Sequence, residues 1–270
     1  MSKQNWYRQV VVLDREQHGG LKLDANPDLG FVADEVVLPI GLQEMEPASL
    51  CYPIVFSLGD QPMPLAVLGV RQGENLFVTQ SHKWLGGAYI PAVVRNYPFV
   101  VIDAGEERQV VGLDTASNLV AEDNAGVPIF EGGDLSEVGR QRIGLCAAYR
   151  ESMRQTAEFG RALAAAGVLE VQDAQIVLPR TADRLKLQGY AVVTPNALDK
   201  LDDATLVEWR SKGWLKALIQ HMASAGQWQR LITMAGARSE GAPAEAPGEE
   251  AHAPEKGGKK RPHKVKGAEA

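Results

Sequence analysis

Short runs of β-branched and aromatic residues, separated by turn residues, recur through the first half of the chain. Runs of this kind are typical of β-strands. The clearest pair, YPIVFSL (52–58) and LAVLGV (65–70), flanks the turn sequence GDQPMP and predicts a β-hairpin. We also expect shorter strands in residues 6–13 and 36–39, and a helical turn in residues 42–50.

The sequence pattern of this hairpin is repeated further along the chain. The motif YPIV (52–55) corresponds to YPFV (97–100), and each copy precedes a turn and a second apolar run. Two more matches follow in the same order: Asn75-Leu76 with Asn118-Leu119, and Gly86-Gly87 with Gly132-Gly133. Internal similarity of this kind indicates repeated units. We therefore expect two related hairpin units that pair into one mainly antiparallel sheet, with chance similarity as the alternative.

Beyond Gly133 the apolar positions recur every three or four residues, which predicts helices. A long helix is expected over residues 138–166, with Asp134 or Ser136 as its N-cap and Gly167 as its C-cap. Its apolar face should lie across the sheet. Residues 175–179 and 184–194 predict a small hairpin, and three closing helices are expected in residues 203–212, 214–225 and 227–235.

These elements predict an α+β fold in which a mixed, mainly antiparallel sheet is packed by a long helix. We expect one domain over residues 1–236, with a β-rich part (1–133) and a mainly helical part (134–236). Residues 237–270 are dominated by Ala, Pro, Glu, Gly and Lys, a composition that excludes a packed core. This charged C-terminal tail is predicted to be disordered.

Charge and composition narrow the possible partners. The net charge is −6; residues 238–270 carry seven basic and six acidic residues, so the remaining body has a net charge of −7. An acidic body argues against nucleic acid as the main partner, because phosphate binding needs a basic face. No apolar run is long enough to span a membrane.

The N-terminal segment and the cysteines predict a cytoplasmic protein. The sequence MSKQNWYRQVVVLD lacks the apolar core and the cleavage site of a signal peptide. Cys51 and Cys146 are 95 positions apart and show no metal-ligand spacing, so free buried thiols in a reducing compartment are expected.

Motifs for catalysis and metal binding are missing from the sequence. We find no GxSxG, SxxK, GxxxxGK[ST] or GxGxxG, and the five histidines never occur three or four positions apart. Asp103, Glu106 and Glu107 are most simply explained as a solvated turn. We therefore expect neither a cofactor nor a metal, and a protein without catalytic activity of its own.

Aromatic residues gather in one stretch, residues 82–103, although Phe, Trp and Tyr make up only 6% of the chain. It combines a Gly-Gly pair and two prolines with a lone arginine, which can stack on a ring or bind a carboxylate. The candidate binding residues are His82, Trp84, Tyr89, Arg95, Tyr97 and Phe99. A structural role for Arg95, and a plain turn position for His82, are the alternatives.

Several motifs resemble the SapC family of bacterial proteins: YPIVF (52–56), LAVLG (65–69), NLFV (75–78), WLGGAYIPAVVRNYPF (84–99) and IQHMASAGQWQRL (219–231). The similarity extends over residues 5–235. The family name refers to a crystalline bacterial surface layer, and its members are commonly encoded beside outer-membrane receptors and flavin-dependent tryptophan-halogenase-like proteins. The resemblance thus implies an accessory role and a possible association with the cell surface, and it supplies no catalytic residues.

Three functions follow from these observations. The first is an accessory protein that binds a peptide or protein partner through the aromatic stretch. The second is an enzyme of undefined class that acts on peptides or small molecules. The third is a structural component of a surface layer. The sequence does not specify an oligomeric state.

Overall fold

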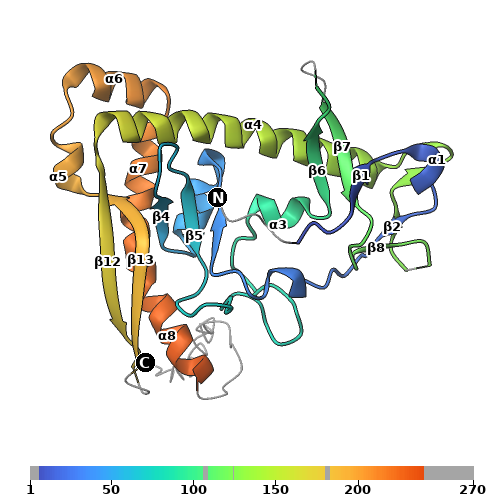
Figure 1. Ribbon diagram of the computed structural model, residues 1–270, viewed down its shortest axis with the longest axis horizontal. Coiled ribbons are helices and arrows are strands. Elements are labelled where there is room, and N and C mark those ends of the chain that lie inside the picture. Colours follow the sequence, from blue (N-terminus) through green and yellow to red (C-terminus); the bar gives the residue numbers. More distant parts are fainter. Residues whose placement is uncertain (1–5, 106–108, 124, 180–182, 240–270) are drawn as a thin grey trace, which may run out of the picture.

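A single long helix, α4 (Glu137–Ala166), runs along the long axis of the molecule and joins two lobes (Figure 1). The computed structural model describes residues 6–105, 109–123, 125–179 and 183–239. The larger lobe lies at the C-terminal end of α4 and the smaller lobe near its N-terminal end. Among the described residues, no helix combines the length and the hydrophobicity needed to cross a bilayer.

The larger lobe contains an antiparallel five-stranded sheet in the order β12-β13-β4-β5-β3. The strands are β3 (Val37–Pro39), β4 (Ile54–Ser57), β5 (Pro64–Val67), β12 (Leu169–Val177) and β13 (Arg184–Val193). The accompanying helices are α2 (Met45–Ser49), α5 (Pro195–Leu198), α6 (Asp203–Ser211), α7 (Trp214–Ala223) and α8 (Gln227–Ser239), with the short 3-10 helices η2 (Leu42–Glu44) and η3 (Ser224–Gly226).

The smaller lobe is built from short strands. One antiparallel sheet has the order β1-β7-β6, with β1 (Val10–Val12), β6 (Phe99–Asp103) and β7 (Gln109–Asp114). A second has the order β8-β2-β9, with β2 (Lys22–Leu23), β8 (Val120–Ala121) and β9 (Val127–Pro128). The pair β10 (Phe130–Glu131) and β11 (Asp134–Leu135) leads into α4. The remaining elements are α1 (Arg15–His18), η1 (Gly30–Val32) and α3 (Ala92–Asn96).

The fold class is α+β, as predicted, and both predicted hairpin units form. They are β4–β5 and β6–β7. The expectation that they share one sheet is wrong, because the two hairpins belong to different sheets in different lobes. The two hairpins do not pair with each other because other strands occupy their edges. Strands β13 and β3 pair with the outer edges of β4–β5, and β1 pairs with β7. Neighbouring segments thus complete each hairpin separately.

Helix α4 follows its sequence signals closely. The Ser136 side chain accepts a hydrogen bond from the Gly139 amide, and Gly167 ends the helix in the left-handed conformation at φ 64°. Of the predicted apolar face, Thr156, Phe159 and Leu163 are buried against the larger lobe. The helix therefore bridges both lobes, and each lobe packs on a different part of it.

The second half of the chain contains more strand than the sequence predicted. The β12–β13 hairpin begins at Leu169, six positions before the predicted start at residue 175, and it supplies the two longest strands of the larger sheet. The closing helices begin and end close to their predicted limits, with Asp202 as the N-cap of α6 and left-handed Gly213 before α7. The expectation of disorder from residue 237 is wrong for residues 237–239, because α8 continues to Ser239; the rest of the predicted tail, from position 240 onward, lies outside the described residues.

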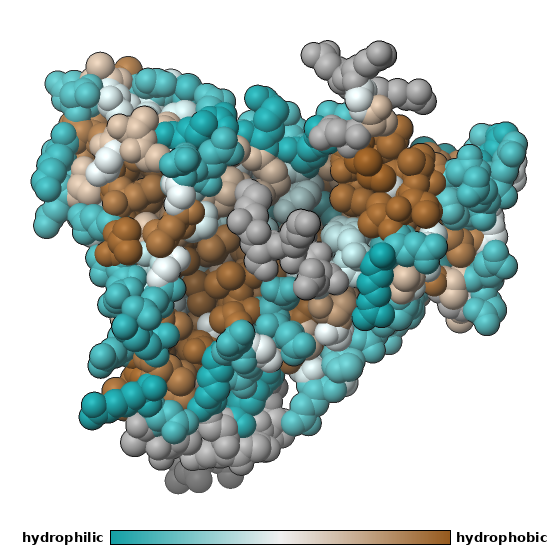
Figure 2. All heavy atoms as spheres, in the orientation of Figure 1, coloured by the Kyte–Doolittle hydropathy of each residue, from teal (hydrophilic) through white to brown (hydrophobic). Residues whose placement is uncertain are grey.

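The hydrophobic core forms two clusters. The larger contains the sheet of the larger lobe with Phe56, Phe77, Trp209 and Trp214. The smaller lies between α4 and the β1-β7-β6 sheet. The other face of that sheet is open, and Figure 2 shows apolar atoms gathered over it, where Val10 and Val12 are exposed. Both cysteines are free and buried, as predicted.

Candidate binding surface

The aromatic stretch passes from the larger lobe to the smaller one. An isolated β-bridge between Val78 and Trp84 fixes its start, and Pro91 precedes the single helical turn of α3. The residue before a proline favours extended conformations, and Tyr97, at φ −58° and ψ 135°, ends α3 in this way before Pro98. The chain then continues into β6. The stretch is therefore a connector whose residues face different environments.

Tyr97 and Phe99, both predicted as binding residues, are buried in the core. The Tyr97 ring packs against Phe31 with centroids 4.3 Å apart, and its hydroxyl donates to Asp114 Oδ2 at 3.2 Å. The Phe99 side chain is fully buried between β6 and α4. Both side chains are buried, and each lines a cavity: Tyr97 one of about 390 Å³ and Phe99 one of about 230 Å³.

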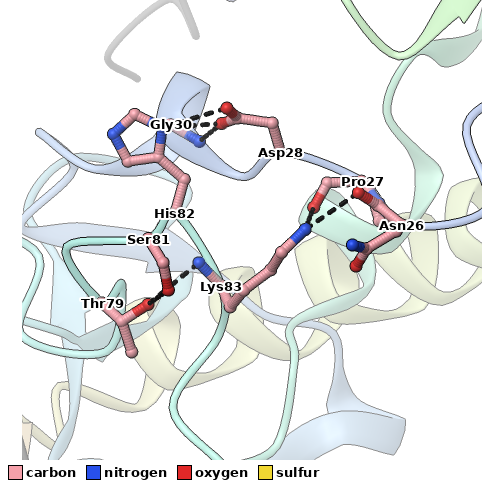
Figure 3. A network of polar contacts seen from close by, with 8 residues as sticks. All are labelled: Asn26, Pro27, Asp28, Gly30, Thr79, Ser81, His82 and Lys83. Carbon is pink, nitrogen blue, oxygen red and sulfur yellow. Dashed lines mark hydrogen bonds and ion pairs between the residues drawn. The ribbon is translucent and has the colours of Figure 1, made fainter.

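His82 belongs to a network that ties two loops together (Figure 3). Its Nδ1 lies 2.9 Å from Asp28 Oδ1, and Asp28 also accepts the Gly30 amide at 2.7 Å. These contacts lower the pKa of Asp28, with the Gly30 hydrogen bond as the largest cause. Lys83 extends the network by donating to the carbonyl oxygens of Asn26 and Pro27. His82 is therefore an exposed residue whose contacts hold two loops together.

Trp84 and Tyr89 are half-buried and connected through Tyr52. The indole Nε1 of Trp84 donates to the Tyr52 hydroxyl at 3.2 Å, and that hydroxyl donates to the Tyr89 carbonyl oxygen. The Trp84 ring stacks on Phe77. Both aromatic residues are thereby fixed in orientation, with part of each ring accessible.

A buried carboxylate, Glu44, holds Tyr89 from the other side. The Tyr89 hydroxyl donates to Glu44 Oε1 at 3.0 Å and accepts from Arg95 Nη2 at 2.8 Å. Glu44 also accepts the amides of Ala92 at 2.6 Å and Gly41 at 2.8 Å. Burial is the main cause that raises the pKa of Tyr89 to about 12, so its hydroxyl stays protonated near neutral pH. Sequence analysis missed Glu44, because its partners are distant along the chain.

An open groove of about 640 Å³ lies beside the Tyr89 ring. Its floor and walls are mainly apolar, and the side chain of Leu50 is 71% exposed there. A Cβ placed on Gly86 or Gly87 would meet no atom within 4 Å, so this wall is formed by bare backbone. The lining residues are Pro47, Leu50, Cys51, Gly86, Gly87, Ala88, Tyr89 and Arg230.

Arg230 of α8 is the cation of this groove. Its guanidinium lies over the Phe77 ring, 5.7 Å from the centroid. Within the described part of the chain, Arg230 forms no ion pair. The groove thus combines an apolar floor with one positive charge, a composition suited to a peptide segment that carries an apolar side chain and an acidic group.

An enzyme would need titratable side chains close together, and of His82, Tyr89 and Arg95 only the last two are in contact. Tyr89 contacts Arg95, but His82 lies in the separate loop network, and the side chain of Asp103 is outside the described residues. No group of three or more His, Cys, Asp or Glu residues that could hold a metal ion occurs in the described ranges.

Comparison with known protein families identifies a match over most of the chain. The family model described as SapC matches residues 13–231, which is most of the chain. No curated protein and no solved structure matches this chain. On the strength of the match over residues 13–231, the chain belongs to the SapC family.

Proposed function

We propose that this protein is an accessory binding protein that holds an extended peptide segment, free or within a protein partner, in the groove beside Tyr89. The observation that carries this proposal is the exposed Leu50 side chain at the edge of an apolar groove. Burial of this exposed apolar surface by a partner would contribute to affinity, by roughly 25 cal/mol per Å² of apolar area removed from water.

The groove also suggests which segment it binds. Leu50 and Tyr89 offer apolar contact, the glycine pair allows a peptide backbone to approach closely, and Arg230 offers a partner for a carboxylate. The preferred ligand is therefore an extended segment with a large apolar residue near an acidic residue or a C-terminal carboxylate.

We further propose a cytoplasmic location for this binding role. The support is that Cys51 and Cys146 are both free, as is usual for thiols in a reducing compartment. An enzyme acting on peptides or small molecules and a surface-layer component remain the other expectations from the sequence, and we find no arrangement in the described residues that favours either.

A displayed library of peptides, selected on the full chain, tests the proposal. We expect enrichment of peptides with an apolar residue close to a carboxylate. Leu50→Asp should weaken their binding by roughly 10-fold or more, since full burial of a leucine side chain contributes about 1.5–3 kcal/mol and 1.4 kcal/mol corresponds to about tenfold in affinity. Arg230→Gln should weaken the binding of acidic peptides and leave the binding of their neutral analogues unchanged.

The matched control is Leu58→Asp, which charges another exposed leucine that does not line the groove. Its binding should equal that of the unaltered protein. The proposal is wrong if selection enriches no such peptides, or if Leu50→Asp and Leu58→Asp bind them equally well. Thermal unfolding of each variant separates lost binding from lost folding.

A further inference from the structure

A second cavity, of about 390 Å³, lies between α3, α4 and the loop around residues 24–29. Its size falls within the range of ~300–1,000 Å³ that is common for small-molecule sites. Aliphatic side chains form most of its wall, among them Leu29, Ile90, Val94 and Leu119. Two arginines, Arg95 from α3 and Arg142 from α4, line the same cavity.

Both guanidinium groups are held in place by hydrogen bonds to other residues of the chain. Arg95 Nε donates to the Ile90 carbonyl oxygen at 2.9 Å, and its Nη2 donates to the Tyr89 hydroxyl. Arg142 Nη1 donates to the Arg95 carbonyl oxygen at 2.7 Å. Three donors, Arg95 Nη1 and the Nε and Nη2 of Arg142, have no protein acceptor among the described residues.

No carboxylate of the described residues contacts either guanidinium directly; Glu44 is linked to Arg95 only through the Tyr89 hydroxyl. Neither arginine forms an ion pair within the described residues, and the one acid that lines the cavity, Asp24, is exposed and accepts the Asn26 amide. Burial lowers the pKa of Arg142, and the nearby positive charge of Arg95 acts in the same direction. Two partly buried like charges repel each other, and an anion placed between them would remove this unfavourable interaction.

We propose that this cavity binds a small carboxylic acid with an apolar body. Its carboxylate would accept hydrogen bonds from Arg95 and Arg142, whose planar guanidinium groups suit carboxylate geometry. Its hydrocarbon part would lie against the aliphatic wall. The site is separate from the groove beside Tyr89, so this inference does not depend on the proposed peptide binding.

Calorimetric titration of the full chain with hexanoate and with hexan-1-ol is the direct test, because the two probes share an apolar body and differ in charge. We expect hexanoate to bind roughly 10-fold or more tightly than the alcohol, the difference typical of charge-assisted hydrogen bonds. Inorganic phosphate should bind more weakly than hexanoate, because it has no apolar part to place in the cavity.

Variants on α4 locate the site. Arg142→Gln should weaken hexanoate binding by roughly 10-fold or more. Arg154→Gln, which removes an exposed arginine of the same helix, should leave it unchanged. Arg142→Lys keeps the charge and loses the planar fork, so it should give an intermediate affinity.

Equal binding of hexanoate and hexan-1-ol, or no binding of hexanoate at ~1 mM, would overturn the proposal. So would phosphate binding more tightly than hexanoate. An Arg142→Gln protein that folds normally and binds hexanoate like the unaltered chain would place the acid elsewhere. Thermal unfolding without ligand checks folding, and the comparison of probes on the unaltered chain remains decisive if Arg142→Gln fails to fold.

Discussion

Two buried asparagines, Asn75 and Asn96, differ in whether their side chains form hydrogen bonds. Asn75 is fully bonded: its Nδ2 donates to the Val32 carbonyl oxygen and its Oδ1 accepts the Phe77 amide. Asn96 is only 4% exposed, yet neither its Nδ2 nor its Oδ1 has a partner in the described structure. It lines an apolar cavity of about 230 Å³ with Phe99 and Val93. An unpaired buried amide destabilises a fold by about 1–3 kcal/mol.

Replacing Asn96 should therefore have an unusual effect. Asn96→Leu is expected to raise the free energy of unfolding by about 1 kcal/mol, because it removes an unpaired amide and adds apolar contact. Asn75→Leu, the matched control, should lower it by about 2 kcal/mol, because it leaves the buried Phe77 amide unpaired and removes one of the two hydrogen bonds that the Val32 carbonyl oxygen accepts. Urea unfolding measures both; equal destabilisation by the two substitutions would contradict this account.

At the scale of elements, α4 decides how the larger lobe is packed. A Cβ on Gly160 would lie 1.9 Å from the Pro62 carbonyl oxygen, so the helix approaches the β4–β5 turn backbone to backbone. Gly144 lies on the same helix, and a Cβ there would meet no atom within 4 Å. The same residue type therefore has a packing role at one position and none at the other.

These two glycines should respond oppositely to alanine. Gly160→Ala is expected to lower the free energy of unfolding by about 1–3 kcal/mol or more, because the backbone of the turn must move. Gly144→Ala should raise it by about 0.5–1 kcal/mol, since alanine is the better helix former. Denaturant unfolding of both variants checks this, and a neutral result for Gly160→Ala would mean that the β4–β5 turn moves freely.

At the scale of the whole molecule, the closing helices are joined to the larger sheet through His221 of α7. Its Nε2 accepts the Val193 amide at 3.0 Å, so the proton of the neutral ring is on Nδ1, which lies 2.9 Å from the Ile54 carbonyl oxygen. Burial lowers the pKa of His221 to about 4. A second proton would bring Nε2–H against the Val193 N–H, so the folded state keeps the ring neutral.

Acid should therefore weaken the fold through His221. Its contribution is complete above pH ~6.5, the pKa of an unfolded histidine, and it is lost as pH falls towards the folded value near 4, because the unfolded chain takes up the proton first. The total loss is about 3 kcal/mol. Denaturant unfolding at several pH values between 4 and 6.5 gives the free energy of unfolding. This free energy should fall less steeply with decreasing pH for His221→Gln than for the unaltered chain. Identical slopes would exclude His221 as the cause.

Local sequence patterns determined most of the elements by themselves. Ser136 and Gly167 set the ends of α4, Asp202 and Gly213 set the limits of the closing helices, and β-branched runs gave both hairpins. These features depend on hydrogen bonds and backbone preferences within a few residues, which is why one sequence is enough to find them.

Tertiary structure alone decided how these elements meet. It placed the two hairpins in separate sheets, buried Tyr97 and Phe99, and left Trp84 and Tyr89 partly accessible. It also brought Arg230 to the groove and Arg142 to the second cavity. The physical reason is that side-chain burial and strand pairing depend on contacts between segments that are far apart in the sequence. The spacing of residues within one segment does not determine these contacts.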